Sequence, residues 1–273
     1  YGFLNSIGHY WEWASLYCCG SRNAAGKVMG LSALGEDIKF NDKELLTISE
    51  SGEIKLDFSI INGFYKNPNI FSLDLSNSRH HQNLAKKVQV ETEKVILKLL
   101  YYLHKKHPSH NLYLSGGVAL NVVLNERIKK SKLFRNVILN GSVEDNGTAI
   151  GAAIATNIKL GLERKFSTIN DYYGRYYSED KMIESISRFD LDYNVLARDE
   201  LFRVAAEFIS QEKIIGWYQG RSEFGPRSLG NRSILANPFS RSTKYILDHY
   251  MKCRDRYRPY APVVIEDQAH KYF

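Results

Sequence analysis

NLYLSGGVALNVVLNERIKKSKLFRNVILNGSVEDNGTAIGAAIATNIK, residues 111–159, contains the same succession of elements twice. A short apolar run at 111–115 stops at Gly116-Gly117 and is followed by a helical pattern. A second apolar run, 134–140, leads through a Gly-containing turn into another helical pattern, which is rich in small residues. Strand, turn and helix in this order predict parallel strands with crossover helices, so the sequence predicts an α/β layered domain.

The two turns carry the residue types of a nucleotide site. Gly116-Gly117 lets the backbone approach a ligand and directs helix amide groups at it, although a plain tight turn uses the same residues. Asp145 and Gly147 lie in the second turn, where Asp145 either holds a metal or caps the next helix. Turns on neighbouring parallel strands meet at one crevice, where α/β proteins bind ligands. The chain has neither a P-loop nor a GxGxxG fingerprint, so we expect a nucleotide site of another kind.

The rest of the chain divides into a first domain, 1–165, and a second α+β domain, 166–273. Residues 53–60 alternate like a half-buried strand, and a long helix is expected from Asn77 or Ser78 to His107-Pro108. Its apolar positions, which we expect in the core, are Leu84, Val88, Val95, Leu99 and Leu103. Beyond the boundary near residue 165, a helix at about 199–211 precedes the strand IIGWYQ, 214–219.

A basic region follows this strand. Between Gly220 and Arg258 there are nine Lys and Arg residues and three acids, which gives a local charge of +6 against +7 for the chain. Glycine and proline turns frame these cations. Converging guanidinium groups on rigid turns suit a phosphate or another small anion. A structural network of ion pairs is the alternative, and the residues alone leave it open.

Composition excludes several classes of protein. With 44% hydrophobic and 25% charged residues the chain is globular, and it has neither a membrane-length apolar run nor a signal peptide. We therefore expect a cytoplasmic protein with no membrane partner. Because the cations form one compact cluster and not a long stripe, a nucleic-acid partner is not expected. Cys18-Cys19 predicts buried packing, and His9, His80 and His81 lack the spacing of metal ligands.

One further segment, AAGKVMGLSALG at 24–35, is expected to be loop-like, with Lys27 able to reach a phosphate. With it, five motifs occur in one order along the chain. They are GKVMGLSALG, the segment Asn83-Leu84-Ala85 with Gln89 and Glu93, SGGVALN at 115–121, EDNGTAIGAA at 144–153, and the pair QGRSEFGPRSLGNRSILANP and KCRDRYRPYAPVV. Together they resemble the O-carbamoyltransferase family, which includes the nodulation carbamoyltransferases and those of antibiotic biosynthesis.

The resemblance implies two catalytic centres. It implies an actin-like (ASKHA, threonylcarbamoyl-transferase-like) domain followed by a YrdC-like α+β domain, both partial in this chain. The YrdC-like part would convert carbamoyl phosphate and ATP to carbamoyl adenylate. The actin-like part would pass the carbamoyl group to a hydroxyl of a sugar or natural-product acceptor. A divalent metal, typically iron, would bind in the actin-like domain, and magnesium would accompany ATP.

Carried onto this chain, the resemblance assigns site residues. Candidates for binding carbamoyl phosphate and the ATP phosphates are Arg227, Arg232, Lys252, Arg254 and Arg258, and Lys27 would contact a cofactor. Candidates for the other nucleotide site are Gly116, Gly117, Asn121 and Gly147. Asp145 would be a metal ligand whose histidine partners lie upstream of residue 1.

Other functional hypotheses stay open at this point. Because segments of the family are absent at both ends, we expect the chain alone not to complete the reaction. One alternative is a tRNA threonylcarbamoyl-type modification protein. Another is a non-catalytic nucleotide-binding fragment. The sequence leaves a homo-oligomer open, with the aromatic-rich first twenty residues as an exposed or interface patch.

Overall fold

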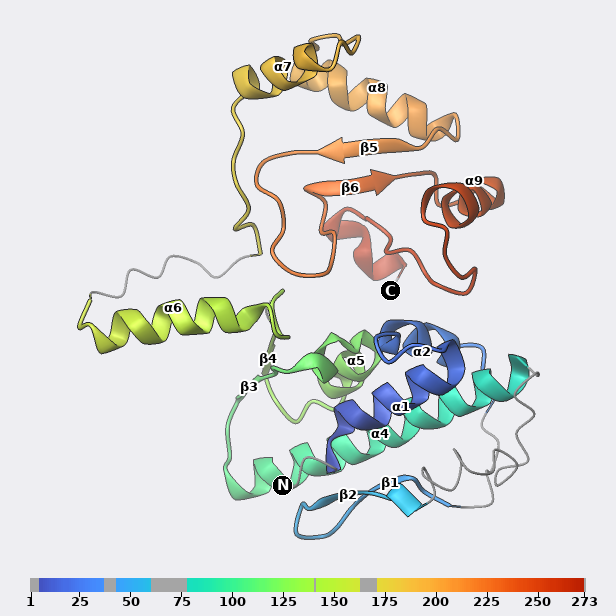
Figure 1. Cartoon of the computed structure of the whole chain (residues 1–273), viewed down its shortest axis with the longest axis vertical. Helices are drawn as coiled ribbons and strands as arrows, with labels where there is room; N and C mark the ends of the chain where they lie inside the picture. Colours follow the sequence, from blue (N-terminus) through green and yellow to red (C-terminus); the bar gives the residue numbers. More distant parts are fainter. Residues whose placement is uncertain (1–4, 37–42, 60–77, 140, 163–170, 273) are drawn as a thin grey trace. The chain divides into compact units, whose positions relative to one another are not determined.

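The computed structural model describes residues 5–36, 43–59, 78–139, 141–162 and 171–272 (Figure 1). It forms two compact units. The first runs to Leu139 and includes Val143–Thr148 and Tyr257–Pro259. The second contains Ala149–Arg256 and the residues from Tyr260 on. The expected boundary near residue 165 lies outside the described residues, and each unit is mixed α/β.

Helix α4 (Ser78–Lys106) is the central element of the first unit, and α1 (Ile7–Cys19) and α2 (Ala25–Ser32) pack along it (Figure 1). The start and the end of α4 confirm the sequence prediction. The helix ends at this point because the residue before a proline, here His107, avoids helical backbone angles. Of the expected core positions, Leu84, Val88 and Val95 are buried and Leu99 packs against the core. Leu103 is 41% exposed, so this prediction is wrong. The neighbouring Leu100 and His104 face Phe134 instead.

The aromatic residues of α1 do not form an exposed patch, contrary to the expectation from the sequence. Tyr10, Trp11 and Trp13 are buried in the described core, and the indole of Trp11 donates a hydrogen bond to Thr92 Oγ1 at 3.0 Å. Cys18 and Cys19 are not in a disulfide, and both half-buried side chains pack against the same core, as predicted. Burial, followed by the neighbouring Cys19, raises the pKa of Cys18 to about 12, so its thiol stays protonated and unreactive.

The segment 24–35 is a helix and not a loop over most of its length. In α2, Val28 and Leu31 are three residues apart and both are buried, so the helix gains a packed face despite its glycines. Gly35, after the helix, lies against α4. A Cβ atom there would approach the Gln82 carbonyl oxygen to 2.2 Å, so only glycine permits this contact.

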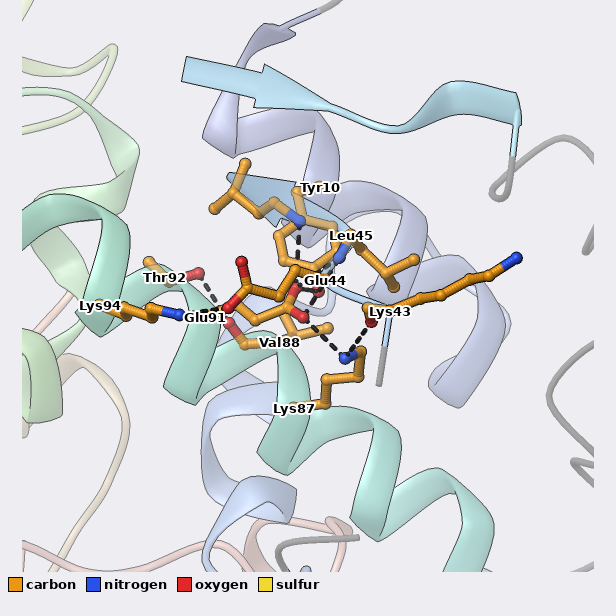
Figure 2. Close-up of polar contacts among 10 residues, drawn as sticks. Tyr10, Lys43, Glu44, Leu45, Lys87, Val88, Glu91, Thr92 and Lys94 are labelled. Atoms are coloured by element: carbon orange, nitrogen blue, oxygen red, sulfur yellow. Dashed lines mark hydrogen bonds and ion pairs between the residues drawn. The ribbon is translucent and has the colours of Figure 1, made fainter. Parts of the chain in front are cut away.

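Two short strands, β1 (Leu46–Ile48) and β2 (Ile54–Leu56), form an antiparallel hairpin with Leu46 opposite Leu56. The expected strand at 53–60 is therefore shorter than predicted. The Glu91 carboxylate of α4 holds this hairpin (Figure 2). It accepts hydrogen bonds from the Leu45 amide at 3.2 Å, the Leu46 amide at 3.1 Å and the Tyr10 hydroxyl at 2.6 Å.

Glu91 is buried, and a buried charge is tolerated only when it is paired and fully hydrogen-bonded. Lys87 supplies the opposite charge, with its Nζ 2.7 Å from the carboxylate, and donates a second bond to the Lys43 carbonyl oxygen. Burial first, and then the nearby Glu91 charge, raise the pKa of Tyr10, so the phenol remains a donor. This cluster joins α1, the β1–β2 hairpin and α4 at one carboxylate.

The strand–turn–helix prediction for residues 111–159 is confirmed. Strand β3 (Asn111–Tyr113) pairs in parallel with β4 (Asn136–Ile138), Asn111 opposite Asn136. Between them lie the 3₁₀ turn η3 (Gly117–Leu120) and α5 (Val122–Lys130), and α6 (Gly147–Lys159) follows β4. Leu100, Leu124, Ile128 and Phe134 form a second core cluster beneath the pair of strands.

The second unit has α7 (Glu179–Arg188), α8 (Arg198–Ser210), the antiparallel pair β5 (Ile215–Tyr218) and β6 (Arg232–Leu235), and α9 (Arg241–Ile246). A single π turn, η4 (Leu247–Met251), continues α9, and a 3₁₀ segment, η5 (Glu266–Lys271), lies near the end. The sequence predicted α8 and β5 but missed α7. Among the described residues, no helix combines the length and the apolarity needed to cross a bilayer.

We predict that Glu91→Gln destabilises the first unit by about 3 kcal/mol, because it leaves Lys87 without its counter-charge in a buried site. Urea unfolding measures the loss. The matched control is Glu126→Gln, since Glu126 forms a solvent-exposed i,i+4 pair with Lys130. Equal unfolding midpoints for the two variants would contradict the central role of the Glu91 carboxylate.

Candidate functional site

The structure brings the two predicted glycine turns together. The Gly116 amide donates to the Val143 carbonyl oxygen at 2.6 Å, and Ser115 Oγ approaches the same oxygen at 3.4 Å. The Leu114 amide donates to the Ile138 carbonyl at 3.0 Å, which extends the β3–β4 pairing to the edge of the turns. Both turns therefore lie at the carboxyl ends of parallel strands, the place where α/β sheets bind ligands.

The first turn has the backbone that its glycines allow. Gly116 has φ +95°, a conformation that residues with a side chain rarely adopt, and Gly117 begins η3 with an ordinary φ. Both residues are exposed, and no atom of the described residues lies within 4 Å of a Cβ atom built on either. The described residues thus leave space at the turn for a ligand, and the amides at the start of η3 are the groups that could bind an anion.

Asn121 has a structural role that the sequence did not reveal. Its side chain is buried, and Oδ1 accepts the Leu124 amide at 3.0 Å, which caps the start of α5. Asn121 Nδ2 donates to Gln89 Oε1 at 2.8 Å, and Gln89 Nε2 donates to Glu93 Oε1 at 2.7 Å. This chain of amides ties the glycine turn to α4, so Asn121 holds the turn in place.

The second turn leads into α6. Thr148 donates through both its amide, at 3.1 Å, and its hydroxyl to the Asp145 carbonyl oxygen. The Asp145 carboxylate is exposed, and no hydrogen bond between described residues uses it, so the side-chain cap considered for it is not formed. Within the described ranges, no three His, Cys, Asp or Glu side chains gather closely enough to hold a metal. The described residues therefore do not make a metal site around Asp145 by themselves.

The first part of the basic region, as far as Asn231, lies in the loop that links β5 to β6 in the second unit. One oxygen of Glu223 accepts three backbone amides, two from this loop and one from the start of β6: Leu229 at 2.8 Å, Asn231 at 2.7 Å and Arg232 at 3.4 Å. Burial raises the pKa of Glu223, but these backbone hydrogen bonds outweigh it, and the pKa lies below its usual value. An ionised carboxylate therefore fixes the loop from inside.

Glycine and serine complete the shape of this loop. Gly225 has φ +118°, and a Cβ atom there would meet the Gly141 carbonyl oxygen at 2.1 Å. Ser228 Oγ donates to the Arg232 carbonyl at 2.8 Å, and Arg221 Nη1 donates to the Gly174 carbonyl at 2.9 Å. The rigid framing that the sequence predicted is thus confirmed for residues 221–232.

Arg227 in this loop and Arg232 at the start of β6 are both exposed. Within the described part of the chain, neither guanidinium takes part in an ion pair, since the acid of the loop, Glu223, is engaged with main-chain amides. A guanidinium without a carboxylate partner keeps its donors for an oxyanion from solution. The two arginines therefore stay candidates for an anion site.

The other candidates are placed differently. Lys252 is exposed after η4, whereas Arg254 is paired with Asp248, its Nε 3.3 Å from the carboxylate. Arg258 belongs to the first unit, in the segment 257–259. Lys27 lies half-buried on α2 and therefore on a helix, not on the expected loop. The basic region thus combines both alternatives of the sequence analysis, a structural ion-pair network and cations outside any described pair.

The sequence analysis did not predict the roles of three supporting residues. Gln89 and Glu223 lie in motifs named above, but they act through hydrogen bonds to a segment far along the chain or to main-chain amides, which no local spacing indicates. Asp248 offered one signal, since it is four residues after Lys244, a spacing that places two side chains on the same face of a helix.

Comparison with known proteins gives consistent matches. The family model for the carbamoyltransferase N-terminus matches residues 1–154. The family model for the carbamoyltransferase C-terminus matches residues 206–273. Nodulation protein NolO of Bradyrhizobium diazoefficiens is 30% identical over 98% of this chain and 50% of its own length. Nodulation protein NolNO of Sinorhizobium fredii is 30% identical over 90% of this chain and 37% of its own length.

A third relative is the 3'-hydroxymethylcephem-O-carbamoyltransferase of Streptomyces clavuligerus. It is 32% identical over 59% of this chain and 29% of its own length. The chain therefore spans half or less of the length of these relatives.

We predict that Gly116→Ala lowers the free energy of unfolding by about 1–2 kcal/mol, because a Cβ atom is strained at φ +95°. Gly117→Ala is the matched control, one residue away with an ordinary φ and open space around it, and we expect it to be nearly neutral. Thermal unfolding of both variants tests this. A Gly116 variant as stable as the Gly117 variant would show that the turn differs from the one described.

A second prediction concerns pH. The lowered pKa of Glu223 means that its stabilisation is complete above the ordinary value of 4.5 and is lost as pH falls through the lower folded value. At neutral pH, Glu223→Gln should cost about 1 kcal/mol. The difference in melting temperature between wild type and variant, followed from pH 7 to pH 3, should shrink to zero at the acid end. A difference independent of pH would exclude the carboxylate as its source.

Proposed function

Because this chain belongs to the carbamoyltransferase family, we propose that it takes part in transferring a carbamoyl group from carbamoyl phosphate to a hydroxyl group. The observation that carries the proposal is the loop 221–232, which presents Arg227 and Arg232 without an ion-pair partner among the described residues. A small phosphate dianion is the kind of ligand that such a pair of guanidinium groups binds.

We propose that the reaction proceeds in two steps. In the first, water cleaves carbamoyl phosphate to carbamate and phosphate, and a carbamate oxygen then bonds to the α-phosphorus of ATP and displaces pyrophosphate, which gives carbamoyl adenylate. In the second, the acceptor oxygen bonds to the carbamoyl carbon, the bond from that carbon to the AMP oxygen breaks, and the hydroxyl proton passes to a base. Fixed cations favour the first step because they neutralise phosphate oxygens without reorganising.

Arg227 and Arg232 would bind the phosphate oxygens of carbamoyl phosphate and ATP in this scheme, with Lys252 as a further cation and magnesium accompanying the ATP. Gly116, Gly117 and Gly147 would line the other nucleotide site, supported by the open space that the described residues leave over the first turn. The first unit would then be the actin-like part and the second unit the YrdC-like part. Iron would need ligands beyond Asp145, so no step is assigned to it.

The acceptor that we propose is a hydroxyl group of a small molecule or saccharide. Support comes from the name of one relative, 3'-hydroxymethylcephem-O-carbamoyltransferase. None of the three cysteines is in a disulfide, in keeping with the cytoplasmic location that we propose. Since the relatives are about twice as long or longer, the complete transfer is proposed for the whole protein of this kind.

We predict that Arg227→Gln weakens the binding of carbamoyl phosphate about tenfold or more, because a charge-assisted, paired contact is lost. Isothermal titration calorimetry measures the affinity. Arg241→Gln is the matched control: it makes the same change of net charge at another exposed arginine, the first residue of α9.

Equal weakening by the two substitutions would reduce the role of Arg227 to general electrostatic attraction and would contradict the assigned site. A chain that binds ATP but not carbamoyl phosphate would support the alternative of a non-catalytic nucleotide-binding protein. Binding of carbamoyl phosphate that depends on Arg227 distinguishes the enzyme from that alternative.

A further inference from the structure

A buried acid lies within the most basic segment of the chain. Asp248, in the π turn η4, is 2% exposed. Its Oδ2 pairs with Lys244 Nζ at 2.5 Å, and its Oδ1 is 3.3 Å from Arg254 Nε and accepts the Tyr260 hydroxyl at 2.9 Å. Both carboxylate oxygens are therefore occupied by groups from α9, from the segment after η4 and from Tyr260.

The two cations are held by more than this carboxylate. The Arg254 guanidinium lies over the Tyr260 ring, 4.0 Å from its centroid, and the Arg254 amide donates to the Asp248 carbonyl at 2.9 Å. Lys244 Nζ also donates to the Arg256 carbonyl oxygen at 2.8 Å. These contacts fix Arg254 and Lys244 in place, whereas Arg227 and Arg232 lie outside any described ion pair.

The negative charge of Asp248 disfavours the binding of anions by the cations around it. Burial raises the pKa of Asp248, but the hydrogen bonds from Lys244, Tyr260 and Arg254 outweigh it and keep the carboxylate ionised at neutral pH. A carboxylate that already occupies a guanidinium competes with any phosphate for the same donors. Its negative charge also repels an anion that approaches the surrounding cations.

We propose that Asp248 sets the anion affinity of this region by acting as an internal counter-ion that withholds Arg254 and Lys244 from the ligand. The inference rests on the proposed function, because it concerns the same phosphate-binding cations. It makes Arg254 a positioning residue held by Asp248, and it leaves Arg227 and Arg232 to contact the phosphate. If Asp248 served folding alone, removing its negative charge would not tighten the binding of anions.

The test is the substitution Asp248→Asn, which removes the charge while an amide oxygen remains to accept from Tyr260 and Arg254. Calorimetric titration with carbamoyl phosphate, and separately with inorganic phosphate, should show binding roughly three- to tenfold tighter than in the wild type at low salt. Tyr260→Phe is the matched control, since it removes a hydrogen bond from Asp248 and keeps the charge. Its affinity should not rise.

A double variant tests whether Arg254 is the source of the tighter anion binding. Asp248→Asn with Arg254→Gln restores the net charge of the wild type and removes the guanidinium whose charge Asp248 no longer neutralises, so the tighter binding should disappear. If Asp248→Asn does not melt cooperatively, Lys244→Gln in the wild-type background replaces it. Because Lys244 is withheld from the ligand, the affinity of the Lys244→Gln variant for carbamoyl phosphate should stay within about threefold of the wild-type value. A tenfold loss of affinity would overturn the inference.

The outcomes separate this inference from the proposed function. Wild-type binding that depends on Arg227 but does not tighten in Asp248→Asn would overturn the inference and leave the proposed function intact. Absence of anion binding in both proteins, when both melt cooperatively, would overturn both. Tighter binding in Asp248→Asn that the double variant cancels supports both.

Discussion

The carboxylate of Glu91 is the interaction on which the first unit depends. It receives the Tyr10 hydroxyl from α1, two amides from the start of β1 and the charge of Lys87 from its own helix (Figure 2). Two residues earlier on α4, Gln89 binds Asn121 and thereby fixes the glycine turn. The same helix thus anchors the core through one polar residue and the candidate nucleotide turn through another.

The second unit uses the same physical device with other partners. Glu223 gathers three main-chain amides, and Asp248 gathers two cations and a phenol. In each case a partly or fully desolvated carboxylate is stable because its oxygens are satisfied, and irregular backbone is ordered around it. The acids of this basic region therefore decide which cations are held by the protein and which face solvent.

Local patterns predicted the parts of the fold that depend on local chemistry. The repeated strand, turn and helix of residues 111–159, the start of α4 at Ser78 and the framing of the loop around Gly225 are all found. The features that the sequence predicted wrongly depend on residues distant in the chain. Segment α2 is helical because Val28 and Leu31 pack into the core, and the aromatic residues of α1 are buried with the help of α4. Similarly, no spacing in the sequence indicates that Asn121 is hydrogen-bonded to Gln89, because the two residues are 32 positions apart.

The bond between Tyr10 and Glu91 spans 81 residues, and this separation has a consequence for folding kinetics. During synthesis α1 emerges before α4, yet α4 supplies part of the surface that covers its tyrosine and tryptophans. Until α4 is complete, α1 can pack on α2 but not on the longer helix, so closure of this long loop must precede formation of the full core. The apolar face of α1 is therefore a point at which the nascent chain is vulnerable to aggregation, and a chaperone that shields α1 would raise the yield.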